Sequence, residues 1–302
     1  MTTPDGRRRL LLVGGAGGLA GRAVLAEFAR DWKIRSVHRH AAANEAGVEW
    51  IRADAAAITD WSPLLNGVEL VVNLAWYRQA PARRFRALAD GLIRLIQASE
   101  SSGVRRWVQL SVPDAPAALE TGLPYLAERR RVDRALTGSR LSYSVVRSTM
   151  LFAPHDKLLS VMLRTMARYH RFPMFGDGAY HVSPIAAHDV ARIVRRESGL
   201  TERHVVSAGG PARWRYSDLT DAMFRALGRN ARYVHFSPHG AVRLAQFLET
   251  FGSSLLYAYE VEWLLSDLLG PPAYEGLATP LAPVEPFLAT EAAQYAPQRS
   301  GG

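Results

Sequence analysis

The sequence predicts an α/β protein with a doubly wound parallel sheet, followed by a small and mainly helical C-terminal lobe. Over the first two-thirds of the 302-residue chain, short apolar segments alternate with amphipathic helical segments. The apolar segments are almost continuously hydrophobic, which is typical of parallel strands buried on both faces. In addition, a glycine-rich stretch joins the first apolar segment directly to the first helical one.

Seven short hydrophobic segments are the predicted strands. They cover residues 8–15, 33–39, 48–54, 68–75, 105–112, 141–148 and, as a seventh, 203–210. Beyond residue 150 helical patterns dominate, so the regular alternation ends there. We therefore expect a core of residues 1–150, joined by a later strand near 203–208, and a lobe made of residues 151–202 and 209–302.

Composition excludes several classes of protein. The chain has no cysteine, which excludes disulfides, thiolate catalysis and cysteine-ligated metals. No apolar run approaches the length of a membrane span, and the first apolar run is too short for a signal peptide. No histidine or carboxylate cluster has metal-ligand spacing. We therefore expect a cytoplasmic protein with no metal and no membrane partner.

The formal net charge is +9, and a basic balance can indicate a nucleic-acid partner. However, all but two of the 37 basic residues are arginines, the exceptions being Lys33 and Lys157. Most of these arginines are scattered along the chain and do not form a patch. We therefore expect a solvated basic surface and no nucleic acid.

A glycine motif follows the first predicted strand. In "LLLVGGAGGLAG", Gly15, Gly18 and Gly21 are spaced three apart, after a strand and at the start of a helix. Such glycines allow a tight turn, a close approach of pyrophosphate to the backbone, and close packing of helix on strand. The helix N-terminus adds free N–H groups and a positive dipole end. This stretch predicts a dinucleotide site, the alternative being a purely structural turn.

Two residues at later strand ends bear on the kind of dinucleotide. Arg39 follows the second strand, between His38 and His40. A carboxylate there would favour NAD, whereas an arginine accommodates the 2′-phosphate of NADP. NADP is therefore preferred over NAD, although Arg39 could be one more surface arginine. Asp54 closes the third strand, where it can meet the adenine amino group or cap the next turn.

These stretches, together with "VVNLA" (71–75) and "PYLAERRRVDRALTGSRLSYSVVRSTMLFAP", resemble the atypical and extended short-chain dehydrogenase/reductases. That family includes NAD-dependent epimerases and dehydratases and has a Rossmann fold. The resemblance implies that residues 1–150 bind NAD(P) and that the lobe binds substrate. It also places Leu19, Leu74 and Ala75 beside the cofactor.

In that family a tyrosine exchanges the substrate proton, and a lysine four residues later holds the nicotinamide ribose. Here Tyr125 is followed by Arg129, and neither lysine follows a tyrosine by four. Arginine supplies the charge but does not readily relay a proton. Two alternatives stay open: with Arg129 in place of lysine, catalysis is retained, or the cofactor is bound and carbonyl reduction is lost or slow. A third is that Tyr125 is a packing residue. Ser111, at the end of the fifth strand, is the oxyanion donor implied by the resemblance, or only caps that strand.

Large side chains after the fourth and sixth strands are the candidate substrate pocket, or else pack the lobe. They are Trp76, Tyr77, Met150, Phe152, His155 and, from the lobe, Phe175. We expect an enzyme, an NAD(P)-dependent oxidoreductase for a small hydrophobic carbonyl or alcohol, acting as a monomer or homodimer. The alternatives are a redox-neutral isomerase, cyclase, epimerase or dehydratase, and a non-catalytic NAD(P)-binding protein.

Overall fold

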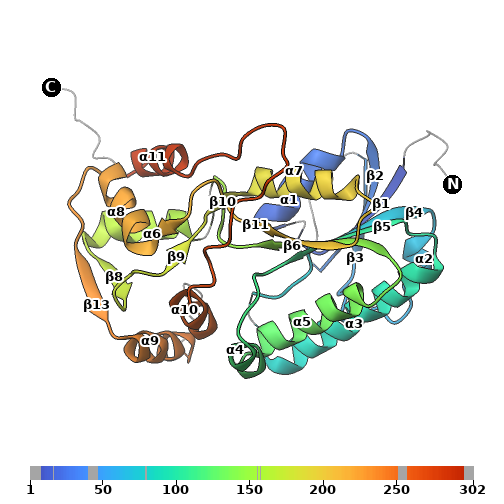
Figure 1. Cartoon of the computed structure of the whole chain (residues 1–302), viewed down its shortest axis with the longest axis horizontal. Helices are drawn as coiled ribbons and strands as arrows, with labels where there is room; N and C mark the ends of the chain where they lie inside the picture. Colours follow the sequence, from blue (N-terminus) through green and yellow to red (C-terminus); the bar gives the residue numbers. More distant parts are fainter. Residues whose placement is uncertain are drawn as a thin grey trace. The chain divides into compact units, whose positions relative to one another are not determined.

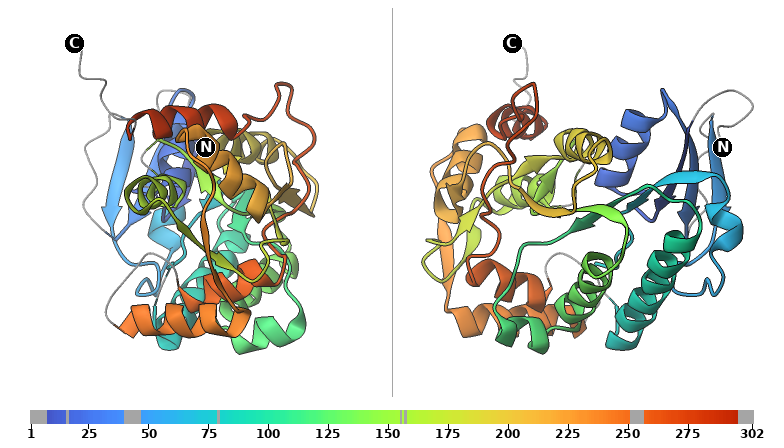
Figure 2. Two further views of the ribbon diagram at one scale, coloured as in Figure 1. Left: turned by 90° about the vertical axis from the view of Figure 1, so that its left-hand side faces the viewer. Right: turned by 45° about the vertical axis from the view of Figure 1, so that its right-hand side comes forward.

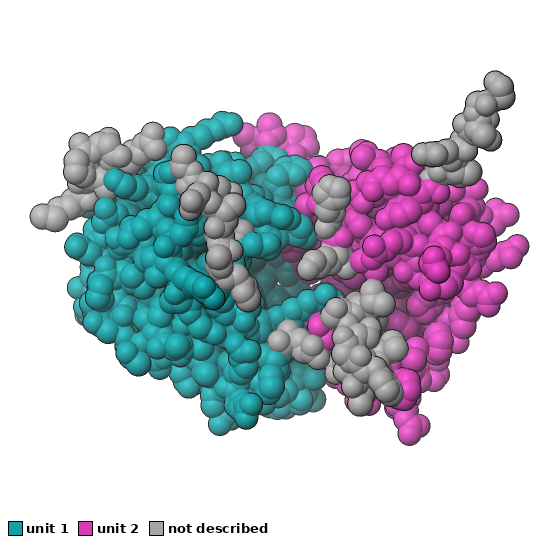
Figure 3. All heavy atoms as spheres, turned by 180° about the vertical axis from the view of Figure 1, so that it is seen from behind, with its two compact units in different colours: residues 1–148, 187–208 teal, residues 149–186, 209–302 magenta. Residues whose placement is uncertain are grey.

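The structure is a computed structural model that describes residues 8–15, 17–39, 47–78, 80–154, 156, 158–250 and 257–295. It divides into two compact units, which Figure 3 shows in different colours. Unit 1 is formed by residues 1–148 and 187–208, and unit 2 by residues 149–186 and 209–302.

Unit 1 contains a seven-stranded sheet in which every strand pair is parallel (Figure 1). The strand order is β11-β6-β5-β4-β1-β2-β3, so the chain reverses direction across the sheet between β1 and β4. Ligands of such folds lie at this reversal, outside the carboxyl ends of the strands. The doubly wound sheet and all seven predicted strands are confirmed. The strands are β1 (Arg8–Val13), β2 (Trp32–His38), β3 (Val48–Arg52), β4 (Val68–Asn73), β5 (Arg106–Ser111), β6 (Ser142–Ser148) and β11 (His204–Ala208).

Helices cover both faces of this sheet, with α1 and α7 on one face and α3 and α5 on the other (Figures 1 and 2). The apolar side chains of the strands are buried beneath them: Leu11 of β1 and Trp107 of β5 have no exposed surface, and neither has Leu92 of α3, which packs on them. The helices of unit 1 are α1 (Leu19–Phe28), α2 (Ser62–Leu65), α3 (Ala82–Ser101), α4 (Ala117–Gly122), α5 (Pro124–Thr137) and α7 (Ala187–Ser198).

The division of the chain differs from the expected one at α7. The sequence pattern predicts residues 151–202 as part of the lobe, whereas the structure groups residues 187–208 with unit 1. The physical reason is that α7 packs along α1 and buries Val190, Ile193 and Val194 completely. Because it covers one face of the sheet, this helix belongs to the core.

Unit 2 has its own hydrophobic core, formed by residues such as Leu163, Val182, Leu219 and Phe224. Its strands form two-stranded sheets in the pairs β7–β10, β9–β12 and β8–β13. No helix in the described part of the chain is long and apolar enough to cross a membrane. The strands are β7 (Leu151–Phe152), β8 (Phe172–Phe175), β9 (His181–Val182), β10 (Ile185–Ala186), β12 (Trp214–Arg215) and β13 (Tyr233–Phe236). The helices are α6 (Leu159–Tyr169), α8 (Tyr216–Ala226), α9 (Pro238–Thr250), α10 (Ala258–Leu265) and α11 (Glu285–Ala293).

Candidate functional site

Two consecutive glycines form the turn after β1. Gly14 and Gly15 have φ angles of 69° and 74°, a region that favours glycine. A Cβ atom added to Gly14 would lie 2.4 Å from the Cα atom of Ala75, and one added to Gly15 would lie 2.8 Å from the Cβ atom of Leu74. The turn therefore lies directly against the segment that follows β4, and no larger residue fits at either position.

The turn leads into the N-terminus of α1. Gly18 is the N-cap, no side chain caps this end, and the first turn carries no acidic residue. Leu19 and Gly21 lie in that first turn. Uncapped N–H groups at the positive end of a helix dipole suit an anion. Gly17 donates its N–H to Nε2 of His38 at 3.3 Å, so in this structure His38 accepts a hydrogen bond from the loop.

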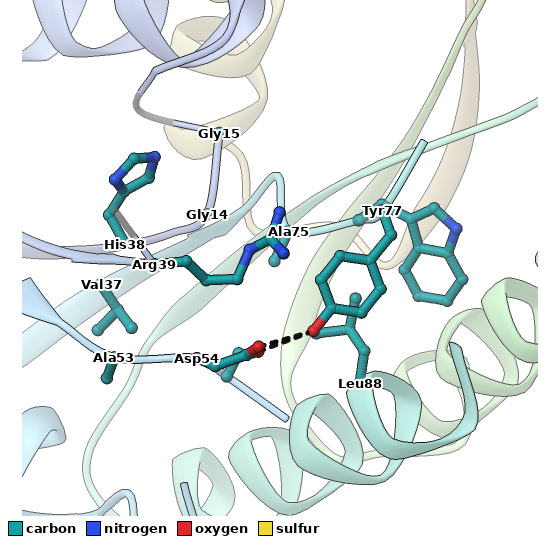
Figure 4. A pocket seen from close by; sticks show the side chains of 12 residues that line it. Gly14, Gly15, Val37, His38, Arg39, Ala53, Asp54, Ala75, Tyr77 and Leu88 are labelled. Carbon is teal, nitrogen blue, oxygen red and sulfur yellow. Dashed lines mark hydrogen bonds between the residues drawn. The ribbon is translucent and has the colours of Figure 1, made fainter. Parts of the chain in front are cut away.

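A pocket opens beside this turn, at the carboxyl ends of β1, β2, β3 and β4 (Figure 4). It brings together Gly15, Arg39, Asp54 and Ala75, which the sequence analysis assigned to the cofactor. It also contains residues that sequence reasoning did not assign to a cofactor. The lining residues are Gly14, Gly15, Val37, His38, Arg39, Ala53, Asp54, Ala55, Ala75, Trp76, Tyr77 and Leu88.

Asp54 and Tyr77 form the central hydrogen bond of this pocket (Figure 4). The Tyr77 hydroxyl lies 2.8 and 3.0 Å from the two carboxylate oxygens of Asp54. Burial and the hydrogen bond to Asp54 raise the pKa of Tyr77, so the phenol remains a donor at neutral pH. Asp54 also accepts the N–H of Ala56 at 3.0 Å, which is the turn-capping role. Its contact with adenine stays a prediction.

Arg39 lies over the ring of Tyr77, with its Cζ atom 4.5 Å from the ring centre. Within the described residues its guanidinium has no carboxylate partner. The side chains around the pocket therefore include a guanidinium that forms no ion pair with any described carboxylate. Such an arrangement favours an anionic ligand.

The tyrosine and arginine of α5 lie four residues apart, so they share one face of the helix. Trp76 contacts both residues. Its ring centre lies 6.1 Å from that of Tyr125, edge to face, and 5.0 Å from Cζ of Arg129. Arg129 is 5% exposed, and its Nη2 donates to the carbonyl oxygen of Leu110 at 2.6 Å. Trp76 also lines the pocket described above. Tyr125 and Arg129 therefore lie next to a residue of the pocket wall.

The protein-family model described as NAD(P)H-binding matches residues 15–200, more than half of the chain. The chain belongs to this NAD(P)H-binding family. The residues around the pocket fit such a ligand, because the glycine turn and the uncapped helix suit a pyrophosphate and Arg39 supplies positive charge. The family match thereby confirms the predicted NAD(P) cofactor, and the preference for NADP over NAD stays a prediction.

Solved structures of sugar-nucleotide epimerases and of a dehydratase share the fold. A nucleoside-diphosphate-sugar epimerase from Staphylococcus aureus has a TM-score of 0.71 at 17% identity, over 92% of this chain and 99% of that one. The UDP-N-acetylglucosamine 4-epimerase of Methanobrevibacter ruminantium M1 has a TM-score of 0.65 at 14% identity, over 76% and 86% of the two chains. A double mutant of the dTDP-glucose 4,6-dehydratase DesIV from Streptomyces venezuelae, with NAD bound, has a TM-score of 0.63 at 18% identity, over 94% and 96%.

No curated protein matches this chain by sequence. The family match confirms that the chain belongs to an NAD(P)H-binding family, and the solved structures confirm the predicted Rossmann fold, which it shares with an epimerase and a dehydratase. At these identities the structural likeness shows the fold alone.

The predicted substrate-pocket residues belong to both units of the NAD(P)H-binding protein. Trp76 and Tyr77 line the pocket of the predicted cofactor residues. Met150, Phe152 and Phe175 are at most 8% exposed and belong to the hydrophobic core of unit 2. Their packing role is therefore shown, and a role at a substrate stays a prediction. His155 lies outside the described residues, as does His40.

Ser111, the predicted oxyanion donor, lies in a buried polar cluster. Its hydroxyl donates to Oδ2 of Asp133 at 2.6 Å, and Nη1 of Arg130 donates to the same oxygen at 2.9 Å. Burial raises the pKa of Asp133, and this effect exceeds the lowering by Ser111, Arg129 and Arg130. Oδ1 of Asp133 has no hydrogen-bond partner within the described residues. In this structure Ser111 therefore donates its hydroxyl proton to Asp133 and not to a substrate.

Replacing Ser111 with alanine is expected to lower the free energy of unfolding by about 1–3 kcal/mol, because it removes one donor from a buried carboxylate. The measurement is urea unfolding at neutral pH, with Ser101→Ala on the exposed side of α3 as the matched control. Steady-state kinetics of the same variant test the oxyanion role. A loss of kcat with unchanged stability would contradict the structural role and support the catalytic one.

Sequence reasoning missed several residues that line the pocket, including Gly14, Val37, Ala55 and Leu88. Gly14 could have been found from the "GG" at the end of the first strand, since a turn of this kind often needs two left-handed residues. Val37, Ala55 and Leu88 carry no local signal. They resemble any other apolar position of a buried strand or helix face.

Proposed function

We propose that this protein is an NADP-dependent oxidoreductase that acts on a small hydrophobic carbonyl compound or alcohol. The observation that carries the proposal is the contact of Trp76 with both Tyr125 and Arg129. Since Trp76 also lines the pocket formed by the predicted cofactor residues, a dinucleotide there would extend toward the tyrosine. Carbonyl reduction needs the proton donor and the hydride donor on the same substrate, and Tyr125 would then lie near the end of the dinucleotide.

A bound nicotinamide supplies the hydride that reduces the carbonyl carbon. Tyr125 donates its phenolic proton to the carbonyl oxygen, and solvent later returns a proton to the phenolate. Arg129 supplies a positive charge that favours the phenolate electrostatically, but a guanidinium does not readily relay a proton, so Arg129 takes no part in the proton relay. Its hydrogen bond to Leu110 and its stacking on Trp76 hold this charge in one place.

The preference for NADP over NAD is supported by charge. Arg39 carries a guanidinium with no carboxylate partner in the described structure, and it lies at the end of β2, where the adenosine ribose of a Rossmann cofactor is recognised. In NAD-specific sites an acidic residue takes this place. A 2′-phosphate would neutralise the charge of Arg39.

A redox-neutral epimerase or dehydratase is the second candidate. It is supported by the similarity of the fold to one nucleoside-diphosphate-sugar epimerase and one dehydratase, each over more than nine-tenths of this chain. Such an enzyme would transfer a hydride to the cofactor and back within one turnover, so the cofactor would not be consumed.

The test is NADPH oxidation by the full chain with a panel of aldehydes and ketones, followed through the absorbance of the reduced nicotinamide. We expect oxidation of NADPH at a higher kcat/KM than NADH. Product formation with no net change in absorbance would instead favour the redox-neutral reaction. If calorimetry detects binding of neither NADPH nor NADH, the proposal is wrong.

A further inference from the structure

We propose that Arg84 is a second residue that recognises the 2′-phosphate of the cofactor, and that the Tyr77 ring holds Arg84 and Arg39 for this purpose. The proposal rests on the NADP preference proposed above. It assigns a specificity-determining role to a residue in the first turn of α3, which no sequence motif indicated.

The geometry shows the two guanidinium groups converging on one ring. The Cζ atom of Arg39 lies 4.5 Å from the ring centre of Tyr77, and that of Arg84 lies 4.9 Å from the same centre. The two Cζ atoms are therefore less than about 10 Å apart, although 45 positions separate the residues in the chain. Cations are attracted by the quadrupole of an aromatic ring, so the Tyr77 ring holds both guanidinium groups near one point of the pocket wall.

Tyr77 is a fixed platform for these charges. It is 5% exposed, its hydroxyl is bonded to Asp54, and its ring packs against Phe85 with 6.3 Å between ring centres. Because the platform is rigid, the arginines lose less conformational freedom when a ligand binds.

Two guanidinium groups and one carboxylate lie around Tyr77, so positive charge is in excess there. Within the described residues the only carboxylate that pairs with either arginine is Asp54, at 3.5 Å from Nη2 of Arg84. That pair is weak, because the Arg84 side chain is 51% exposed and exposed pairs contribute little. The oxygens of Asp54 already accept hydrogen bonds from Tyr77 and Ala56. Arg84 can therefore turn from Asp54 to a ligand at little cost.

A phosphate monoester matches this arrangement. It carries close to two negative charges at neutral pH and three acceptor oxygens, and planar guanidinium groups bind phosphate through paired hydrogen bonds. A phosphate between Arg39 and Arg84 would remove the repulsion between them. A ribose with a free 2′-hydroxyl would leave it in place, so the site would select NADP.

The experiment measures, by calorimetry on the full chain, the affinities for 2′,5′-ADP and for 5′-ADP. These probes differ in whether the second phosphate is at the 2′-position. Arg84→Gln is expected to weaken 2′,5′-ADP binding by about tenfold or more, and to change 5′-ADP binding by less than about twofold. The matched control is Arg83→Gln, which removes the same charge from the neighbouring exposed position of α3 and is expected to change neither affinity.

The Tyr77 platform is tested with Tyr77→Leu, which removes the ring, and Tyr77→Phe, which keeps it. We expect the leucine variant to lose more of the preference for 2′,5′-ADP than the phenylalanine variant. Thermal unfolding confirms that each variant is folded.

Two results would overturn the proposal. One is that Arg84→Gln behaves like Arg83→Gln, and the other is that it weakens both probes equally. Failure of the proposed function would look different. In that case the wild-type chain would bind neither probe, or would bind both with equal affinity.

Discussion

Replacing Tyr125 with phenylalanine is expected to lower kcat for carbonyl reduction by about 10²–10⁴-fold, the usual contribution of a positioned general acid. The substitution removes one oxygen atom and leaves the ring. The edge-to-face contacts with Trp76 and Phe85, at 6.1 and 5.7 Å between ring centres, are therefore kept. For this reason we expect NADPH affinity to change by less than about twofold. The measurements are steady-state kinetics and calorimetric titration of NADPH.

The matched control for this variant is Tyr169→Phe, at a tyrosine of unit 2 that is 61% exposed. It is expected to leave kcat unchanged. Turnover of Tyr125→Phe at the wild-type rate would remove Tyr125 from the mechanism. The packing role of this tyrosine would then be its whole function, and the proton would have to come from another group.

Replacing Arg106 with leucine is expected to lower the free energy of unfolding by about 3–5 kcal/mol, because it leaves a buried carboxylate without its cation. Arg106 is 4% exposed at the start of β5, and Nη2 lies 3.9 Å from the carboxylate of Glu197. Arg106 donates hydrogen bonds to the carbonyl oxygen of Glu197 at 2.9 Å and to the hydroxyl of Ser142 at 2.7 Å. It also donates to the carbonyl oxygen of Glu202 and to the hydroxyl of Ser144. The substitution therefore also frees polar groups on α7 and β6.

The control for this prediction is the adjacent Arg105→Leu. The Arg105 side chain is 79% exposed and lies 3.8 Å from Glu69, so its loss is expected to cost at most about 1 kcal/mol. Urea unfolding of both variants gives the comparison. Equal effects of the two substitutions would show that the buried charge of Glu197 is compensated without Arg106, for example by His204, whose Nε2 lies 2.7 Å from it.

The strands and the glycine turn could be read from the sequence because each is a local pattern. Parallel strands buried on both faces need continuous apolar segments, and residues 8–15 and 68–75 both carry them. The turn after β1 needs left-handed residues, which only glycine adopts at low cost. The four-residue spacing of Tyr125 and Arg129 likewise fixes their common helix face. None of these inferences requires knowing which distant residues meet.

The environment of each predicted residue was decided only by the tertiary structure. Sequence reasoning placed Tyr77 in a substrate pocket, whereas the fold places it against Asp54, Arg39 and Arg84. It offered Ser111 as a donor to substrate, and the fold gives its proton to Asp133. Such contacts join residues that are far apart in the chain. They follow from how strands and helices stack, so the sequence by itself determined the elements and the class of cofactor, and packing decided which partner each polar group received.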